Sequence, residues 1–390
     1  LVTGYHIIFF WVARMLIMGM EFMKEIPFEK VFIHGLVRDS QGRKMSKSLG
    51  NGIDPLEVIE KYGADTLRFM LITGNTPGND MRFYWERVEG TRNFANKIWN
   101  ASRFALMNME GYDKDAELAP YTLADKWILS RLQDTVKDVT SLLERFELGE
   151  AGRAIYDFIW SEVCDWYIEI AKPRLYNKEA AAERATAQHV LATVLVSAMK
   201  LLHPYMPFIT EELWQALEPR KEGESLMVAQ MPEVAVADSA YLDAFEIVKE
   251  IVGGVRTIRL QKNIPNKDAL ELQIVGEHNE AFNAVIAKMC NLSSISKVEE
   301  KAAGAVSFLV RTTEYAVPLG NLINVEEELA KLQEELKYQK GFLTSVMKKL
   351  GNENFVSKAP AKVIEMEKKK QADAESKIKS IEESIAALTK

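Results

Sequence analysis

Val31–Asn51 is the stretch that decides the fold of the first part of the chain. It consists of Val31-Phe-Ile-His-Gly-Leu-Val-Arg38, then Asp39-Ser-Gln-Gly42, then Arg43-Lys-Met-Ser-Lys-Ser-Leu-Gly-Asn51. The first segment has the short, β-branched, apolar character of a buried parallel strand. The second segment is a turn, and Asp54 with Pro55 is typical of the start of a helix. Strand, glycine-containing loop and helix in this order predict the tail of an α/β nucleotide-binding sheet.

The loop between the predicted strand and helix carries two lysines, Lys44 and Lys47, with the hydroxyls of Ser46 and Ser48 beside them. Ammonium groups that reach a polyphosphate stabilise the charge that develops as a phosphate bond breaks. Glycines on both sides suit a loop that closes when its anion is present. Two lysines three residues apart are often only a solvated turn. The full pentapeptide in this setting favours phosphate chemistry.

Length and composition limit the class of protein. A chain of 390 residues predicts two to four domains, and 47% hydrophobic with 27% charged residues is typical of a soluble globular protein. The 49 basic and 56 acidic residues give a net charge of -7, which argues against indiscriminate coating of nucleic acid. Cys164 and Cys290 lie far apart without metal-ligand spacing, which indicates a reducing compartment such as the cytoplasm and no zinc site.

The segment Gly4–Met23 is apolar and long enough to span a bilayer. His6 and Arg14 interrupt it, and no basic leader or small-residue cleavage site accompanies it. We therefore expect a buried helix, with neither a membrane span nor a signal peptide. Because the chain opens at Leu1 in core-like sequence, we also expect a fragment whose upstream partner is missing.

Long amphipathic patterns dominate the middle of the chain and predict an all-α bundle followed by a smaller α/β unit. The bundle helices are expected at Val88–Asn108, Ala124–Phe146, Gly149–Leu175 and Ala181–Leu202. The smaller unit is expected to hold a helix near Leu242–Lys262 and strands at Leu270–Val275 and Val306–Val310.

The last seventy residues have the clearest periodicity. Apolar positions follow a 4-3 spacing through Val325, Leu329, Leu332, Leu336, Gln339, Leu343, Val346 and Leu350. After a turn at Gly351–Pro360 the spacing resumes at Ala374, Ile378, Ile381, Ile385 and Leu388. Two helices of similar length joined by a turn predict an antiparallel coiled-coil hairpin.

The pentapeptide Lys44-Met45-Ser46-Lys47-Ser48 matches the second signature, KMSKS, of the class I aminoacyl-tRNA synthetases. Its surroundings resemble the bacterial-type valyl-tRNA synthetases and cover the whole chain, more loosely over Leu242–Val317. The resembling segments are Thr3–Met15, His34–Asp39, Asn51–Pro55, Asn93–Arg103, Cys164–Glu169 and His203–Trp214.

The resemblance implies a multidomain, mainly α-helical C-terminal fragment in four parts. Residues 1–85 would be the C-terminal part of a Rossmann-like α/β catalytic domain with the KMSKS loop, and residues 86–235 a helical anticodon-binding domain. Residues 236–320 would form a small α/β linker domain, and residues 321–390 a coiled-coil tRNA-binding arm.

The resemblance also implies a valine–tRNA ligase. The enzyme would form valyl-adenylate from valine and ATP with Mg²⁺, then charge valine tRNA, as a cytoplasmic monomer without zinc in this fragment. Lys44 and Lys47 would act as catalytic phosphate contacts with Ser46 and Met45 in the same ATP-binding loop. His34 and Gly35 would lie beside the adenine. The family's first signature, HIGH, does not occur in this sequence, and the editing domain is missing, so we expect no adenylate formation by this chain alone.

Five residues near the start are implied to border the amino acid or the adenylate: Thr3, Gly4, His6, Ile7 and Trp11. Ile7 and Trp11 lie one helical turn apart and face one side, which suits an aliphatic pocket and equally suits core packing. The family usually has aspartate where this chain has His6, and neutral histidine pairs poorly with an ammonium group. His6 is therefore either a tolerated variant or the mark of a weakened adenylate site.

Basic residues that could contact tRNA lie in three places, and for each one a solvated helix face is the alternative. They could neutralise phosphates without reading sequence. They are Arg87, Arg92, Lys97 and Arg103 on the first bundle helix, Arg256 and Arg259 in the small unit, and Lys348, Lys349, Lys368, Lys369 and Lys370 in the hairpin.

Three other functions compete with the ligase fragment: a tRNA-binding module without catalysis, a structural protein that uses the hairpin for partner contacts, and the equivalent fragment of an isoleucyl-tRNA synthetase. The lysine loop argues against a purely structural protein, which has no use for it. The segments that flank the loop favour the valyl over the isoleucyl family.

Overall fold

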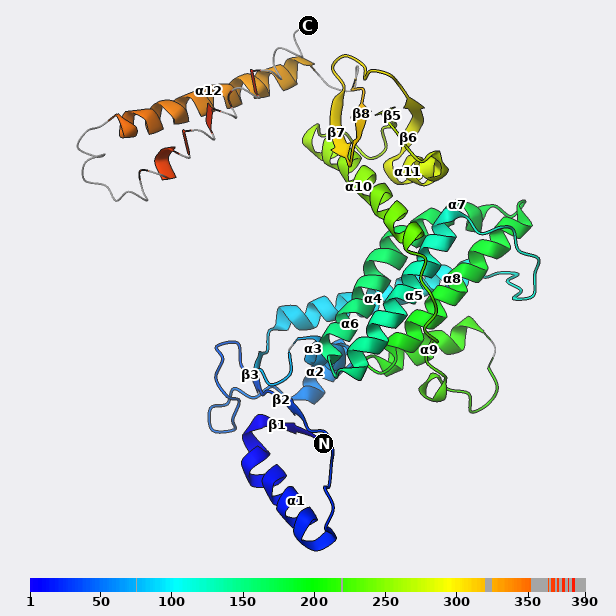
Figure 1. The fold of residues 1–390 in the computed structure, drawn as a ribbon, viewed down its shortest axis with the longest axis vertical. Helices are drawn as coiled ribbons and strands as arrows, with labels where there is room; N and C mark the ends of the chain where they lie inside the picture. The colour runs from blue at the N-terminus through cyan, green and yellow to red at the C-terminus, as the bar shows by residue number, and fades with distance from the viewer. Residues whose placement is uncertain are drawn as a thin grey trace. The chain divides into compact units, whose positions relative to one another are not determined.

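The structure is a computed structural model that describes residues 1–74, 76–218, 220–319 and 325–351, with scattered residues between 364 and 382. It is mainly helical and divides into two compact units, Leu1–Glu246 and Ile247–Lys390. Figure 1 shows the order of the elements along the chain. Each unit is described separately.

The N-terminal part contains two small pairs of parallel strands. β1 (Val2–Gly4) pairs with β2 (Phe32–His34), and β3 (Val37–Arg38) pairs with β4 (Met81–Arg82). The single strand predicted over Val31–Arg38 is therefore two strands with different partners. The break lies at Gly35, because a Cβ there would lie only 1.8 Å from the Asn79 carbonyl oxygen and the backbone must turn to make this approach.

A continuous helical segment, Tyr5–Met23, connects β1 to β2 and contains α1 (Ala13–Met18) between 3₁₀ and π turns. The prediction that it is buried is wrong for this structure, since Phe9 is 86% exposed and Phe22 is 73% exposed. β2 and β3 are likewise only partly buried. Apolar composition gives the preference of a side chain, but burial needs a covering surface, and the described part of this chain supplies none.

Two described helices are long and apolar enough to cross a membrane by length and composition alone. One is Tyr5–Met23. The other is Ala181–Leu202, two-thirds buried, which is the core helix of the bundle. Such a helix in a protein core passes the same test as a membrane span, so composition alone does not separate the two.

Two short helices follow the loop: α2 (Pro55–Tyr62) and α3 (Ala64–Thr73). The predicted cap is confirmed, since Asp54 accepts a hydrogen bond from the Leu56 backbone N–H at 2.8 Å. Residues from α2, α3, β4 and the next helix form one hydrophobic cluster: Val58, Leu67, Met70, Met81, Phe83 and Val88.

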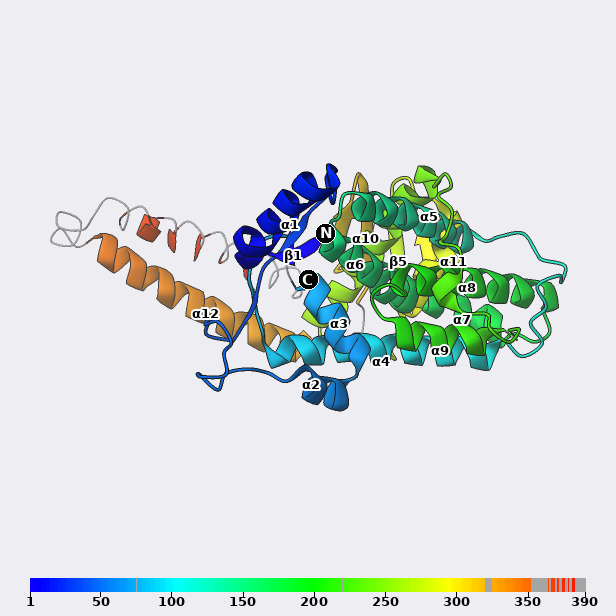
Figure 2. The same ribbon diagram turned by 90° about the horizontal axis from the view of Figure 1, so that it is seen from below.

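The helical bundle contains the long helices predicted from periodicity, with ends shifted by a few residues, and a shorter helix over Pro207–Leu217 that was not predicted (Figure 2). The helices are α4 (Trp85–Asn108), α5 (Leu123–Glu144), α6 (Leu148–Asp157), α7 (Ile168–Tyr176), α8 (Ala181–Leu202) and α9 (Pro207–Leu217). A π-helical segment, Phe158–Tyr167, joins α6 to α7, so that the stretch predicted as one helix is continuous but not purely α-helical.

A buried polar cluster stabilises the bundle. Asp125 is fully buried near the start of α5, and its carboxylate accepts two hydrogen bonds from the Arg174 guanidinium at 2.7 Å and one from the Tyr167 hydroxyl at 2.7 Å. Its neighbour Thr122 completes a capping box with it at the N-terminus of α5. A bidentate pair with further donors satisfies a carboxylate that water cannot reach.

Helix α3 also connects the N-terminal part to the bundle. The Asp65 carboxylate accepts hydrogen bonds from the backbone N–H groups of Phe208 and Ile209, at the start of α9. The Arg68 guanidinium donates to the carbonyls of Pro204 and Tyr205, in the turn between α8 and α9.

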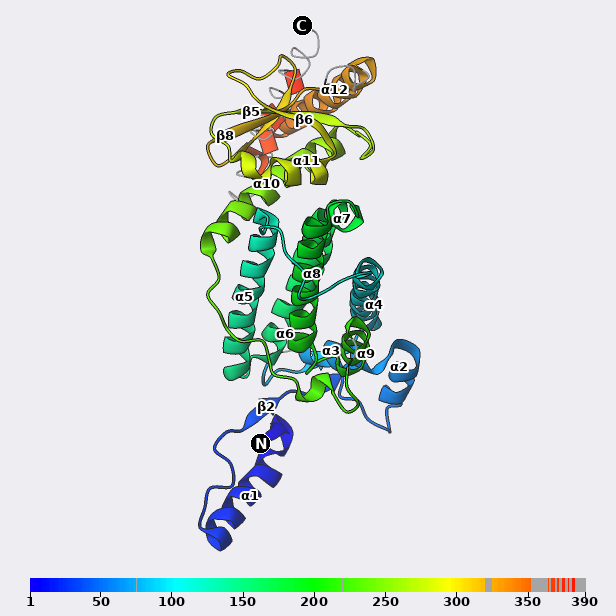
Figure 3. The same cartoon turned by 90° about the vertical axis from the view of Figure 1, so that its right-hand side faces the viewer.

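The second unit contains a four-stranded mixed sheet in the order β6-β5-β8-β7. α10 (Ser239–Gln261) leads into it from the first unit, and α11 (Asn283–Cys290) connects the parallel strands β5 and β6 (Figure 3). β5 (Leu270–Val275) and β7 (Val306–Val310) have the predicted bounds. β6 (Leu292–Lys297) and β8 (Thr313–Val317) were not predicted, because β6 is mostly polar and β8 follows a two-residue turn.

The last described helix is α12 (Val325–Leu350). Among the scattered residues beyond it, Glu382 forms an ion pair with Lys340 at 2.7 Å, and the charge of Lys349 contributes to lowering the pKa of Glu367. As the residue number rises from 340 to 349 along α12, the number of the partner residue falls from 382 to 367, as in two antiparallel segments. The predicted turn at 351–360, together with Ile385 and Leu388, lies almost wholly outside the described residues, so the complete hairpin stays a prediction.

Candidate functional site

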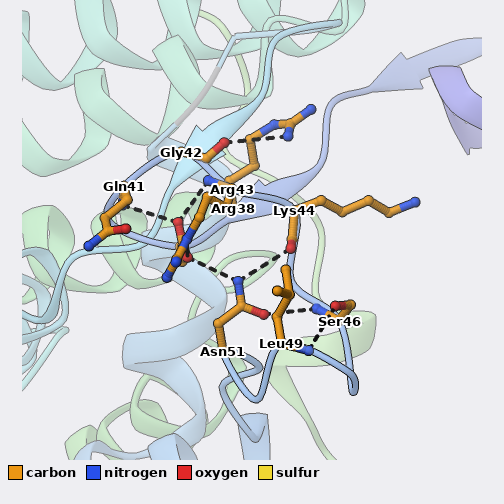
Figure 4. Close-up of polar contacts among 9 residues, drawn as sticks. Arg38, Gln41, Gly42, Arg43, Lys44, Ser46, Leu49 and Asn51 are labelled. Atoms are coloured by element: carbon orange, nitrogen blue, oxygen red, sulfur yellow. Dashed lines mark hydrogen bonds and ion pairs between the residues drawn. The ribbon is translucent and has the colours of Figure 1, made fainter.

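The lysine loop is organised around one carboxylate, Asp39, which follows β3 and is 7% exposed. Its Oδ1 accepts from the backbone N–H groups of Gln41 at 3.1 Å and Arg43 at 2.7 Å. Its Oδ2 accepts from Arg43 Nε at 2.7 Å and from Asn51 Nδ2 at 2.9 Å (Figure 4). The Asn51 bond and the Arg43 contacts hold the pKa of this carboxyl at about 2, although desolvation opposes the shift.

Asn51 closes the other end of the loop. Its Oδ1 accepts from the Ser46 backbone N–H at 3.0 Å, and its Nδ2 donates to the Lys44 carbonyl at 3.3 Å as well as to Asp39. Two left-handed glycines, Gly42 at φ 81° and Gly50 at φ 59°, turn the backbone at the two ends. Residues 39 to 51 are therefore tied by side chains, with turns that only glycine adopts easily.

Within the pentapeptide, the methionine faces inward and the two lysines face solvent. Met45 packs against the hydrophobic cluster formed by α2, α3 and β4. Lys44 and Lys47 are exposed and form no ion pair within the part of the chain that the structure describes. Figure 4 shows the Lys44 side chain extended away from the loop. Both ammonium groups are thus available to an anion.

A second polar network connects the loop to the start of the N-terminal helical segment. Arg38 is the last residue of β3, pairs with Lys44 in a short antiparallel bridge, and forms an ion pair with Asp80. Asp80 also accepts from the Leu36 backbone N–H at 2.8 Å and from the Tyr5 hydroxyl at 3.1 Å. These contacts hold the pKa of Asp80 below its usual range. The loop, β3 and Tyr5 are therefore parts of one connected network.

The residues expected beside the adenine and the adenylate are brought together at the carboxyl ends of β1 and β2. Gly4 is opposite His34 in the parallel register, and a Cβ on Gly4 would lie 2.8 Å from the His6 ring and 3.4 Å from the His34 ring. Thr3 is buried beside them. The carboxyl ends of parallel strands are where α/β sheets bind ligands.

Ile7 and Trp11 are less clearly part of a pocket. Ile7 is half-buried, whereas Trp11 is 54% exposed with the Arg14 guanidinium 5.8 Å from its ring centroid. The regular α-helical spacing assumed for the two residues is absent, since a 3₁₀ turn ends at Ile7 and a π turn follows.

A cavity of about 270 Å³ lies on the side of His34 and Gly35 that faces α3 and the start of α6. Its wall is mostly apolar, with Phe32, Leu71 and Leu148 among the lining residues. The strand that carries the expected adenine contacts therefore has open space beside it.

The basic residues proposed for RNA have different environments. Lys97 forms an ion pair with Asp165 at 2.8 Å, and Arg103 is exposed. Arg87 donates to the Gly74 carbonyl at 3.3 Å. The structure gives Arg259 a role in the fold instead of the predicted RNA contact: it is 5% exposed and donates to the carbonyls of residues 265, 290 and 291.

The remaining basic candidates are mostly exposed. Arg92 lies with its guanidinium 6.0 Å from the centroid of the Tyr62 ring, and Arg256 is exposed on α10. Lys348, Lys349 and Lys368 are exposed, Lys370 forms an ion pair with Glu367, and Lys369 lies outside the described residues.

Sequence reasoning missed the three residues that shape the site: Asp39, Asn51 and Asp80. A signal existed for Asp39, because aspartate at the first position of an Asp-x-x-Gly turn commonly accepts from the backbone two residues later. Asp80 is 42 residues from Arg38, and no local pattern indicates a contact at that separation.

Three family models match separate parts of the chain. The family described as "tRNA synthetases class I (I, L, M and V)" matches residues 1–84, and "Anticodon-binding domain of tRNA ligase" matches residues 125–274. "Valyl tRNA synthetase tRNA binding arm" matches residues 324–389. The solved Mycobacterium tuberculosis methionyl-tRNA synthetase in complex with methionyl-adenylate is similar in fold, with a TM-score of 0.50 and 23% identity over 61% of this chain and 48% of that one.

Curated relatives match along the full chain. The Valine--tRNA ligase of Parabacteroides distasonis is 68% identical, over 100% of this chain and 44% of that protein. The Valine--tRNA ligase of Bacillus subtilis is 48% identical, over 100% of this chain and 45% of that protein. The chain therefore spans less than half the length of these relatives.

The matches at residues 1–84 and 125–274 give the class of protein, a class I aminoacyl-tRNA synthetase. The lysine loop after a parallel strand and the helical bundle that follows it lie in this order along the chain. The family match at residues 324–389 and the curated relatives show which member of this class the chain resembles. The chain belongs to the valyl-tRNA synthetase family.

Proposed function

We propose that this chain serves the ATP-dependent joining of valine to its tRNA and supplies the KMSKS loop and tRNA-binding parts of that enzyme. The observation that carries the proposal is the loop itself. Asp39 and Asn51 fix its backbone while the ammonium groups of Lys44 and Lys47 remain exposed. A backbone held in this way presents two positive charges to solvent, where the oxygens of a polyphosphate can reach them.

In the first step, a carboxylate oxygen of valine attacks the α-phosphorus of ATP. A new oxygen–phosphorus bond forms, the bond from the α-phosphorus to the bridging oxygen breaks, and pyrophosphate leaves with the negative charge. Lys44 and Lys47 stabilise that charge as it grows, and Ser46 contributes a hydroxyl to the same loop. Mg²⁺ arrives with the phosphates of ATP as part of the substrate.

In the second step, a hydroxyl at the 3′ end of the tRNA attacks the carbonyl carbon of valyl-adenylate. An ester bond forms, the bond from the carbonyl carbon to the phosphate oxygen breaks, and AMP leaves with the proton of the hydroxyl. Residues at the carboxyl ends of β1 and β2 suit the adenylate: His34 and Gly35 beside the adenine, and Thr3, Gly4 and His6 beside the acyl phosphate. Histidine at position 6 favours hydrogen bonding over pairing with the valine ammonium group.

The exposed face of Tyr5–Met23 fits this proposal. Its apolar side chains, with Ile7 and Trp11 near the start, suit packing against the remainder of a catalytic domain and a branched aliphatic substrate. Such a pocket excludes larger side chains but discriminates valine from threonine by only about a hundredfold, so the complete enzyme needs an editing activity.

The proposed layout follows the four expected parts: residues 1–85 for catalysis, 86–235 for the anticodon, 236–320 as a linker domain and 321–390 as a tRNA-binding arm. Exposed basic residues are the candidates for phosphate contacts, and Arg259 is left out because it is buried. We propose a cytoplasmic monomer that binds valine tRNA. The isoleucyl alternative is less well supported, since the relatives described above carry the name of the valine enzyme.

The test separates catalysis from RNA binding. The 390-residue chain alone is assayed for valine-dependent ATP–pyrophosphate exchange and for binding of a transcribed valine tRNA at several salt concentrations. We expect salt-sensitive binding without exchange, because the sequence has no HIGH signature to hold ATP from the other side. Pyrophosphate exchange by the chain alone would contradict the proposal that it cannot form adenylate without the rest of the enzyme. The absence of salt-sensitive tRNA binding would favour a structural role.

A further inference from the structure

A second cavity, about 380 Å³ in volume, lies in the first unit away from the KMSKS lysines. It is bounded by the end of α3, by the early turns of α4 and by the later part of α6, and α3 packs against both of the other helices. Its wall includes two arginines from different helices, Arg87 on α4 and Arg153 on α6. Two guanidinium groups in one concavity are unexpected on a chain with a net charge of -7.

The arginines are positioned in different ways. Arg87 donates to the Gly74 carbonyl at 3.3 Å and lies with its guanidinium 5.6 Å from the centroid of the Tyr84 ring. It thereby covers the carbonyl end of α3, which would otherwise repel an anion. Arg153 is held by Glu150, one turn earlier, at 3.3 Å. Each guanidinium keeps further N–H donors beyond these contacts, since an arginine has five.

The remaining wall suits a phosphate on a sugar chain. Gly90 lines the cavity, and a Cβ there would meet nothing within 4 Å, so the wall is open at this position. Tyr156 adds a ring, and its hydroxyl makes no hydrogen bond within the part of the chain that the structure describes. Guanidinium groups match the oxygens of a phosphate, and a tyrosine contributes a donor and a flat surface.

The cavity is also close to the catalytic loop in the packing. Met70 of α3 lines the cavity and belongs to the hydrophobic cluster against which Met45 of the loop packs. The same hydrophobic cluster therefore contacts both the cavity and the loop. An RNA held here would lie on the same helical layer that supports the KMSKS loop.

We propose that the cavity between α3, α4 and α6 binds a backbone phosphate of the tRNA, through Arg87, Arg153 and Tyr156. The inference rests on the proposed function and adds a specific phosphate site to it. Phosphate contacts position an RNA without reading its sequence, so the site would set how the tRNA lies on the bundle.

The test uses the full 390-residue chain and a transcribed valine tRNA, with binding measured by filter retention over a range of salt concentrations. Arg87→Gln and Arg153→Gln should each weaken binding by roughly three- to tenfold and make the salt slope shallower by about one unit. Gly90→Gln should also weaken binding while every charge is kept, because its side chain fills the cavity. Thermal unfolding of each variant checks that the fold is retained.

Arg145→Gln is the matched control. Arg145 is 55% exposed and paired with Glu147, as Arg153 is 53% exposed and paired with Glu150, but it does not line the cavity. The control should bind within about twofold of the unmodified chain. The proposal is overturned if Arg87→Gln, Arg153→Gln and Gly90→Gln bind as the control does.

Two further outcomes separate the possible errors. If the unmodified chain does not bind the tRNA, the proposed RNA binding fails and this site fails with it. If inorganic phosphate raises the unfolding temperature of the unmodified chain but not of Arg87→Gln/Arg153→Gln, and tRNA binding is the same for both, the cavity takes a free anion. That result also overturns the RNA assignment, while leaving the proposed ligase function intact.

Discussion

Among individual residues, Asp39 has the largest influence on the geometry of the KMSKS loop. Its carboxylate accepts four hydrogen bonds, two from backbone N–H groups and two from side chains. The folded state holds its pKa at about 2. Because an unfolded aspartate titrates near pH 4, its contribution to stability is complete above about pH 4 and is lost as the pH falls toward 2.

Asp39→Asn should therefore loosen the loop at every pH above about 4, where the unmodified residue is ionised in both states. An amide presents two donors to a site that contains only donors, so at least one contact becomes repulsive. We expect hydrogen exchange at the N–H groups of Gln41 and Arg43 to become about tenfold faster or more. Asp134→Asn, at a half-buried position of α5, should leave both rates unchanged, and equal rates in the two variants would contradict the role of Asp39.

Gly35 gives a second prediction at this scale. A Cβ there would overlap the Asn79 carbonyl, so Gly35→Ala should destabilise the first unit by about 1–3 kcal/mol in urea unfolding. Gly52→Ala is the matched control, because a Cβ at Gly52 would meet nothing within 4 Å. Similar stability of the two variants would show that the close approach at Gly35 is not needed.

The sequence could predict residues that belong to a local motif, but not residues whose contacts are with distant parts of the chain. Lys44 and Lys47 could be singled out because their signature is local, and the structure places both on an exposed loop between strand and helix. The Arg38–Asp80 ion pair could not, because it depends on strand pairing between segments more than forty residues apart.

Among the elements, α3 links the loop to the bundle. One part of α3 contributes Leu67 and Met70 to the cluster beneath Met45, while Asp65 and Arg68 hold the start of α9 and the turn before it. The loop and the bundle are therefore attached to the same ten-residue helix.

Asp65→Ala should remove the carboxylate that accepts from the first N–H groups of α9. By analogy with the loss of a helix N-cap, we expect about 1–2 kcal/mol of destabilisation in urea unfolding of the chain. Asp134→Ala, which removes a half-buried ion pair with Arg131 one helical turn away, should cost about 0.5 kcal/mol or less. An Asp65→Ala variant as stable as that control would show that the contact contributes little.

Helices were easier to predict than strands for a physical reason. The long bundle helices α4, α5 and α8 repeat an apolar pattern over more than twenty residues, whereas β6 and β8 have six and five residues and little alternation. The prediction that Tyr5–Met23 is buried was wrong, because hydropathy gives only the tendency of a side chain to avoid water. Burial also needs a surface that covers the side chain, and the sequence of the helix does not show whether one is there.

For the whole molecule, the two compact units and the family matches describe different divisions. The units meet at residues 246 and 247, while the anticodon-binding match runs from 125 to 274 and so includes the helix that joins the units. The relatives are more than twice as long as this chain. Adenylate formation is therefore a property to be tested in a complete enzyme.

The most direct measurement is valine-dependent ATP–pyrophosphate exchange by the full-length Parabacteroides distasonis relative with this chain in place of its matching segment. Lys47→Ala should lower the exchange rate by roughly a hundredfold or more, because a charge stabiliser of the leaving pyrophosphate is lost. Lys178→Ala, which removes another exposed lysine distant in sequence from the loop, should leave the rate unchanged. Equal exchange rates for the Lys47→Ala enzyme and the unmodified enzyme would contradict the account.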